Sequence, residues 1–124
     1  MQKHLTTLLG AAFVLALAAP LFAAPETITG EVISLSCYTQ DKTEIGRKGY
    51  TCALATIKWE GNPAGILTAD GKVYQVTGGL AANNNEKLWS LIGHTVTISG
   101  EVSQRPGLLP LIAAADAKDV SPPK

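Results

Sequence analysis

Two nearly identical hexapeptides lie near opposite ends of this 124-residue chain. Residues 27–32 read TITGEV and residues 97–102 read TISGEV, so that only the third position differs. Six residues are too few to indicate a duplicated domain. We interpret them as two strands rich in β-branched residues, each with a glycine where a tightly curved sheet bends. In the first strand, residues 26–38, the apolar alternation changes phase near Gly30, which predicts a bulge or a sharp bend.

The residues between the hexapeptides predict a hairpin and then a helix. In residues 65–78 two apolar runs flank Asp70-Gly71, the signature of a tight type I′ turn. In residues 82–93, Asn83 can cap a short helix whose apolar side chains include Leu88 and Trp89, and Gly93 can end it. Strands are then expected over residues 94–104 and 107–120. The segment between the first strand and the hairpin has no clear period, and residues 52–59 suit either a helix or a strand.

This order predicts a mostly β fold, a small five-stranded OB-like barrel with one short helix between the third and fourth strands. In such a barrel the long first strand pairs with the fourth, so the two hexapeptides would be neighbours. Pairing could also bring the carboxylates of Glu31 and Glu101 together for acid–base chemistry. Outward-facing polar positions on separate strands are the simpler interpretation. An open half-barrel or small sandwich is the alternative fold.

The first residues predict export. Residues 1–23 contain a positively charged start, an uncharged apolar run and small residues, which is typical of a secretory signal peptide cleaved near 23/24. A membrane-spanning helix is the alternative. Residues 24–120 then make a single domain and residues 121–124 a disordered tail. We expect a periplasmic or secreted protein with no stable membrane insertion after cleavage.

The charge of the predicted mature chain speaks against one class of partner. Loss of Lys3 would leave 9 of the 10 basic residues against 10 acidic ones. A nearly neutral domain lacks the basic surface that nucleic acids require, so we expect no nucleic-acid partner.

The two cysteines of the chain, Cys37 and Cys52, lie 15 positions apart. In an oxidising compartment two cysteines in a small domain usually pair, and closing this loop would stabilise the fold by about 3 kcal/mol. We therefore expect a structural disulfide. Two free thiols, a metal site and a redox pair remain alternatives. Two sulfur ligands fall short of the usual four, and the spacing is far from C-x-x-C.

Much of the predicted domain resembles a group of small exported bacterial proteins of unassigned function. Their pattern is G-x-V-x-x-x-x-C-Y, a loop with glycine and often histidine, then C-A-x-x-C-x-x-x-G-x-P-x-G-L-L-x-x-x-G-x-V-Y. The matching residues are Gly30, Val32, Cys37, Tyr38, Gly49, Cys52, Ala53, Gly61, Pro63, Gly65, Ile66, Leu67, Gly71, Val73 and Tyr74. This chain has Thr56 in place of the third cysteine, and Gly49 or Tyr50 where the pattern often has the histidine. A metal- or haem-ligand role is therefore not carried over.

Catalytic signals are weak, so we expect a protein that is not an enzyme and has no cofactor. No G-x-S-x-G, phosphate-binding loop or dinucleotide fingerprint is present. Four aromatic residues are candidates for contact with a ligand or partner: Tyr38, Tyr50, Trp59 and Tyr74. Packing beneath the cysteine loop is the alternative role for them.

These observations favour a binding or accessory module of the cell envelope. Its partner would be another envelope protein or a small ligand, met by the disulfide-tied loop 38–51. The alternative is a protein that handles a metal or cofactor through Cys37, Cys52 and His94. Nucleic-acid binding rests on fold analogy alone.

Overall fold

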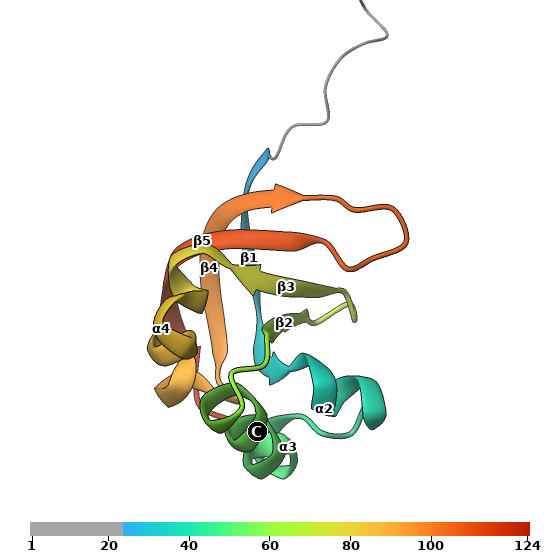
Figure 1. Ribbon diagram of the computed structural model, residues 1–124, viewed down its shortest axis with the longest axis vertical. Coiled ribbons are helices and arrows are strands. Elements are labelled where there is room, and N and C mark those ends of the chain that lie inside the picture. The colour runs from blue at the N-terminus through green and yellow to red at the C-terminus, as the bar shows by residue number, and fades with distance from the viewer. Residues whose placement is uncertain (1–23) are drawn as a thin grey trace, which may run out of the picture.

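The computed structural model describes residues 24–124, and the predicted signal peptide lies outside the described residues. Five strands form a closed barrel in the order β1-β2-β3-β5-β4 (Figure 1). The strands are β1 (Ala24–Ser34), β2 (Ala64–Thr68), β3 (Val73–Thr77), β4 (Thr95–Ser103) and β5 (Leu111–Ser121). The parallel pair β3–β5 and the antiparallel pair β1–β4 complete the ring. This is the predicted OB-like barrel.

The two hexapeptides are neighbours, as the fold prediction required. They lie in β1 and β4, where Ile28 is opposite Ile98 and Thr29 is opposite Thr97. The hydroxyls of Thr29 and Thr97 are 2.9 Å apart on the outer face. The sequence similarity therefore reflects two adjacent strands that curve together.

The two glycines of the hexapeptides differ in their surroundings. At Gly100 the β4–β5 register shifts, and a Cβ atom there would lie 2.1 Å from the carbonyl oxygen of Ala113. At Gly30 the pairing of β1 stays in register with both neighbouring strands, so the predicted bulge is in β4 and not in β1. The changed phase in β1 has another cause. Val32, Ile33 and Ser34 are all buried because helices cover the outer face there.

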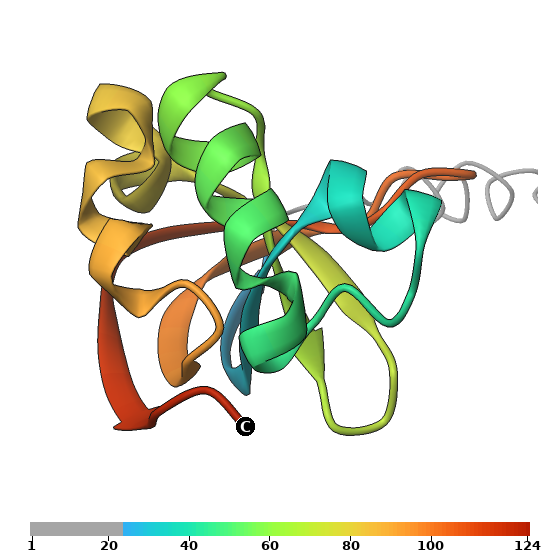
Figure 2. The ribbon, with the colours of Figure 1, turned by 90° about the horizontal axis from the view of Figure 1, so that it is seen from below.

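The connection from β1 to β2 is helical. The sequence left a helix open for residues 52–59 and did not predict one before them. It contains α2 (Leu35–Gln40), α3 (Gly46–Ala53) and η1 (Leu54–Trp59), the last a π-helical continuation of α3. Figure 2 shows α3 and η1 as one helix crossing the barrel, with α2 on one side of it. The Thr56 hydroxyl is 3.0 Å from the carbonyl oxygen of Cys52 and competes for it with the helix backbone. Such competition favours the wider turn of η1.

The β2–β3 hairpin is present, but its turn is not type I′. Only Gly71 has positive φ, at +89°, and its amide donates to the carbonyl of Thr68. Asp70 instead lies within hydrogen-bond distance of the Thr68 hydroxyl. The loop is therefore a turn followed by one left-handed glycine, the second common hairpin geometry.

The predicted helix between β3 and β4 is broken into short pieces. These are η2 (Gly78–Ala81), α4 (Ala82–Asn85) and η3 (Glu86–Leu91), of which η2 and η3 are 3₁₀ turns. The prediction that Asn83 caps a helix is wrong, because Asn83, Asn84 and Asn85 all have positive φ. Gly93, at φ +82°, ends the segment as predicted.

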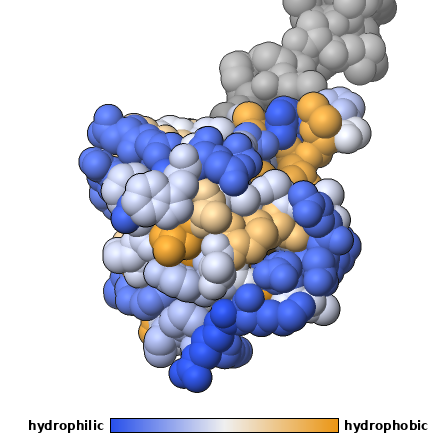
Figure 3. Space-filling view, turned by 60° about the horizontal axis from the view of Figure 1, so that its bottom comes forward, coloured by the Kyte–Doolittle hydropathy of each residue, from blue (hydrophilic) through white to orange (hydrophobic). Residues whose placement is uncertain are grey.

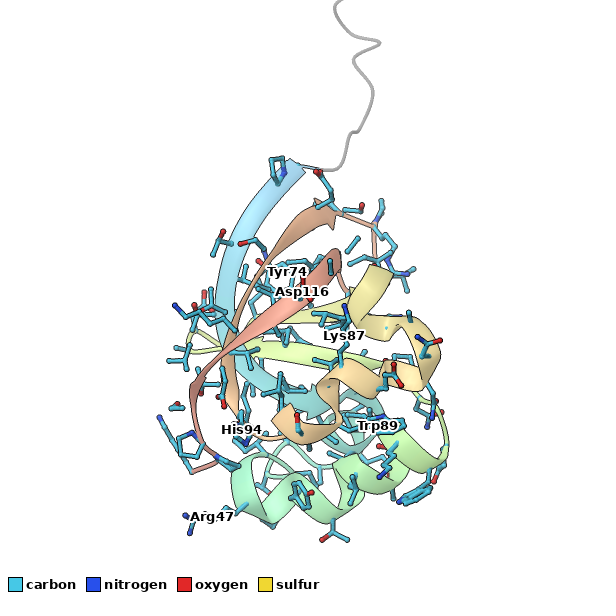
Figure 4. The ribbon with its side chains drawn as sticks, turned by 90° about the vertical axis from the view of Figure 1, so that its left-hand side faces the viewer. Arg47, Tyr74, Lys87, Trp89, His94 and Asp116 are labelled. Atoms are coloured by element: carbon cyan, nitrogen blue, oxygen red, sulfur yellow. A yellow bond between two sulfur atoms is a disulfide. The ribbon has the colours of Figure 1, made fainter. Side chains whose placement is uncertain are left out.

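The core fills the barrel and is closed by these short helices. Strand side chains point inward, while Leu80, Leu88 and Ile92 come from the η2–η3 region and its end. Lys87 on η3 contacts Asp116 on β5, with Nζ and Oδ1 3.2 Å apart (Figure 4). The helical segments and barrel are thus joined into one unit.

Candidate binding surface

The disulfide predicted between Cys37 and Cys52 is present and joins α2 to α3, with the two Cα atoms 6.2 Å apart. Helix α2 begins at a standard cap, because the Ser34 hydroxyl accepts a hydrogen bond from the amide of Cys37 at 3.2 Å. Cys37 is buried, and Cys52 is half-buried. The disulfide therefore fixes two helices of six and eight residues, which are too short to be stable by themselves.

Thr56 lies beside this disulfide. Its hydroxyl is 3.6 Å from Sγ of Cys37 and 2.7 Å from the hydroxyl of Ser34. The position that would carry a third cysteine in the pattern of the predicted resemblance is therefore adjacent to the sulfur pair. In this chain a hydroxyl network occupies that place.

The start of α3 is held by residues far away in the sequence. The amide of Gly46 donates to the Glu31 carboxylate at 2.6 Å, and the amide of Arg47 donates to the carbonyl of Lys124 at 3.0 Å. Two of the amides that a helix leaves unpaired at its start are satisfied in this way. The second hydrogen bond also positions the C-terminal residues. Strand β5 ends at Ser121, and Lys124 lies against the start of α3.

Partial burial raises the pKa of the Glu31 carboxyl above its usual value, although the Gly46 amide and the charge of Lys124 oppose the change. Glu31 is opposite Thr95, and Glu101 is opposite Pro25, near the other end of β1. The two glutamates therefore do not form a carboxylate pair.

The four aromatic candidates have different surroundings. Tyr50 on α3 is 42% exposed, and Trp59 at the end of η1 is 72% exposed. Tyr38 on α2 is half-buried, with the Lys42 ammonium 4.8 Å from its ring centre. Tyr74 is only 4% exposed and belongs to the core. The prediction that it contacts a ligand or partner at the surface is therefore wrong. The alternation in β3 places Tyr74 on the same face as the buried Val76.

Trp59 belongs to a cluster that the sequence did not reveal. The ammonium of Lys58 is 4.8 Å from the ring centres of both Trp59 and Trp89, at cation–π distance. Trp89 on η3 donates from Nε1 to the carbonyl of Asn84 at 2.9 Å, and Nδ2 of Asn84 donates to the carbonyl of Lys58 at 2.6 Å. Figure 4 shows Trp89 beside the helix that carries Lys58. The only sequence feature that pointed to this cluster was the run of three asparagines, residues 83–85, because asparagine tolerates left-handed backbone.

Figure 3 looks at the lower part of the molecule, where α2 and α3 lie, and shows hydrophobic surface bordered by hydrophilic surface. Ile45, at the start of α3, is exposed. Lys48 lies near Asp41, with Nζ and Oδ2 3.5 Å apart. An apolar centre with a charged rim is the usual composition of a protein contact surface.

The three residues named as possible metal ligands are not grouped. Within residues 24–124, no three His, Cys, Asp or Glu side chains come together as a metal site. Nδ1 of His94 instead lies 3.0 Å from the Asp119 carboxylate and links β4 to β5.

Comparisons of the chain with protein-family models, curated proteins and solved structures give no match. The resemblance to small exported bacterial proteins therefore stays a prediction. Across the described part of the chain, every helix is too short or too polar to span a membrane.

Proposed function

We propose that this protein is a non-enzymatic binding module of the cell envelope. It contacts a protein partner through the disulfide-tied segment 38–51, with Ile45 and Tyr50 as apolar anchors. The supporting observation is the exposure of Ile45, directly before α3, and of Tyr50 within it. The two ends of this helix are fixed, by Glu31 at its start and by Cys52 near its end.

A fixed helix suits recognition for an energetic reason. Ordering a loop on binding costs about 0.5–1.5 kcal/mol for each mobile side chain that is immobilised. Here the backbone is ordered before the partner arrives, so less of the contact energy is lost. Exposed tyrosines are also enriched among the residues that contribute most to binding. Export, predicted from residues 1–23, supplies the compartment.

The test compares two variants of the tagged, exported protein. In the first, Ile45→Ser and Tyr50→Ala are combined; in the second, Leu109→Ala removes an apolar side chain of similar exposure from the β4–β5 loop. Chemical cross-linking in intact cells, followed by mass spectrometry, identifies bound proteins. We expect one partner to be lost from the first variant and retained by the second.

Two results would contradict the proposal. One is a partner that both variants retain, which would place the contact elsewhere. The other is a partner lost equally from both variants, which would indicate a general effect on folding. Thermal unfolding of each variant separates loss of contact from loss of fold.

A further inference from the structure

A small pocket opens between the end of η1, strand β3 and the asparagine segment. Its volume is about 260 Å³, and its wall includes Gly61, Gln75, Thr77, Asn84 and Asn85. The wall contains no charged residue. A second pocket of similar size, about 250 Å³, is different because Glu31 and Lys124 line it. The uncharged pocket therefore suits a neutral ligand better than an ion.

Asn85 contributes a buried side-chain amide to the wall of this pocket. The residue is 4% exposed, and its Nδ2 donates to the carbonyl of Asn62 at 3.2 Å. No hydrogen bond to its Oδ1 is found within residues 24–124. Leaving a buried acceptor unpaired usually costs about 1–3 kcal/mol, which a bound hydroxyl would recover.

The backbone beside the pocket is strained. Asn83, Asn84 and Asn85 are consecutive left-handed residues, with φ of 52°, 62° and 62°. Asparagine tolerates this conformation better than most residues, but it normally occurs singly. The bonds from Asn84 to Lys58 and from Trp89 to Asn84 hold the run in place. Strain retained by such supporting contacts is a feature of ligand sites.

An exposed aromatic ring lies next to the pocket in the sequence. Trp59 is two residues from Gly61 in the wall, and the Lys58 ammonium is 4.8 Å from the Trp59 ring centre. Trp59 is not part of the pocket wall, but the residue is 72% exposed, so the ring face opposite Lys58 is open to a ligand that extends out of the pocket.

We propose that this pocket binds a sugar ring of a neutral saccharide. Amide and hydroxyl groups match the alternating donors and acceptors of sugar hydroxyls, and an exposed indole matches the apolar C–H face of the ring. At about 260 Å³ the pocket is just below the ~300 Å³ at which pockets for drug-sized molecules begin, so it holds one ring with the rest of the chain outside.

Extended peptides, the competing neutral ligands, fit less well. They commonly bind by adding a strand to an open sheet edge. Strand β3 at the pocket is paired with β5 through Gln75 to Thr77, and with β2 only as far as Gln75. The edge left unpaired at Val76 and Thr77 is two residues long, which is shorter than an ordinary added strand. The proposal is independent of the protein-binding surface, because the pocket contains neither Ile45 nor Tyr50.

The test uses the folded protein and three neutral trisaccharides: cellotriose, maltotriose and tri-N-acetylchitotriose. Saturation-transfer NMR detects binding, and tryptophan fluorescence titration gives the Kd. We expect at least one of the sugars to bind and to change the fluorescence. Trp59→Ala and Gln75→Ala should each raise its Kd by roughly tenfold, the effect of losing one good contact. The side-chain amide of Gln75 makes no hydrogen bond within residues 24–124, and the alanine variant keeps the backbone bond from residue 75 to the carbonyl of Pro110, so the fold should stay intact.

Tyr50→Ala is the matched control, because it removes an exposed aromatic ring from the other surface, and it should leave the Kd unchanged. Absence of binding by all three sugars at millimolar concentrations would overturn the proposal. So would a Kd that neither Trp59→Ala nor Gln75→Ala changes. If sugar binding fails while cross-linking still depends on Tyr50, only the pocket assignment is wrong.

Discussion

Removal of the disulfide should lower the stability of the barrel substantially. Cys37 and Cys52 are separated by 15 residues, and opening a loop of this length costs about 3 kcal/mol in the chain-entropy model. For a domain near 100 residues, 1 kcal/mol corresponds to ~4–8 °C in Tm. Reduction should therefore lower Tm by roughly 12–24 °C.

The double variant Cys37→Ala/Cys52→Ala should be slightly less stable than the reduced protein. Cys37 is 2% exposed, and replacing its sulfur leaves a small void beside Thr56. Loss of such a small group costs on the order of 1 kcal/mol. Comparing reduced protein with the variant thus separates loop closure from packing.

The measurement is thermal unfolding by circular dichroism with and without a phosphine reductant, with thiol titration to confirm the redox state. The variant should not respond to reductant. The barrel core does not include Cys37, so the reduced protein should still unfold in one transition from the same β-sheet signal. If reduction lowers Tm by less than ~4 °C, the reasoning is refuted, and packing alone holds α2 and α3 in place.

Three other predictions concern single residues. Because burial raises the pKa of Glu31 above 4.5, the folded protein loses stability as pH rises from about 4.5 through the higher folded-state pKa. Glu31→Gln should remove that loss, so its Tm relative to wild type should increase between acid and neutral pH; a constant difference would contradict this. Gly100→Ala, whose Cβ would overlap the carbonyl oxygen of Ala113, should cost about 1–3 kcal/mol or more, measured by urea unfolding. A Cβ at Gly71 would have no atom within 4 Å apart from its chain neighbours, so Gly71→Ala is its control and should cost only the ~1–2 kcal/mol of the left-handed backbone; equal losses would exclude the overlap as the cause. Leu88→Ala, at a fully buried position, should cost about 2–5 kcal/mol in the same assay, and a smaller loss would indicate that η3 is not part of the core.

The barrel could be predicted because its strands carry local signals. The hexapeptides, the Asp70-Gly71 turn and the stop at Gly93 are each contained within a few residues. Hydrophobic alternation then fixed which strands exist, and closure of the sheet fixed their order. Cys37 and Cys52 could be paired because few alternatives exist for two cysteines in an exported domain.

The helices between β1 and β2 could not be predicted because their causes are not local. Helix α3 begins at Gly46, with φ +59°, and contains Gly49, and glycine weakens helices. A Cβ at Gly49 would lie 2.3 Å from the carbonyl carbon of Glu44, so the turn needs glycine although the helix does not. The partners that stabilise α3, Glu31 and Lys124, are distant in the sequence. The sequence therefore predicted an irregular loop for residues 38–51 and left residues 52–59 open between helix and strand.

The helix formed by α3 and η1 connects the two proposed surfaces. Tyr50 and Trp59 are nine residues apart, or about 13 Å along a helix. Residues at that separation that share no partner generally act independently. The disulfide acts nearer to Tyr50, since Cys52 follows it by two positions, whereas the Trp59 end is held by Asn84. Reduction should thus weaken protein binding more than sugar binding, because each surface depends on its own set of long-range contacts.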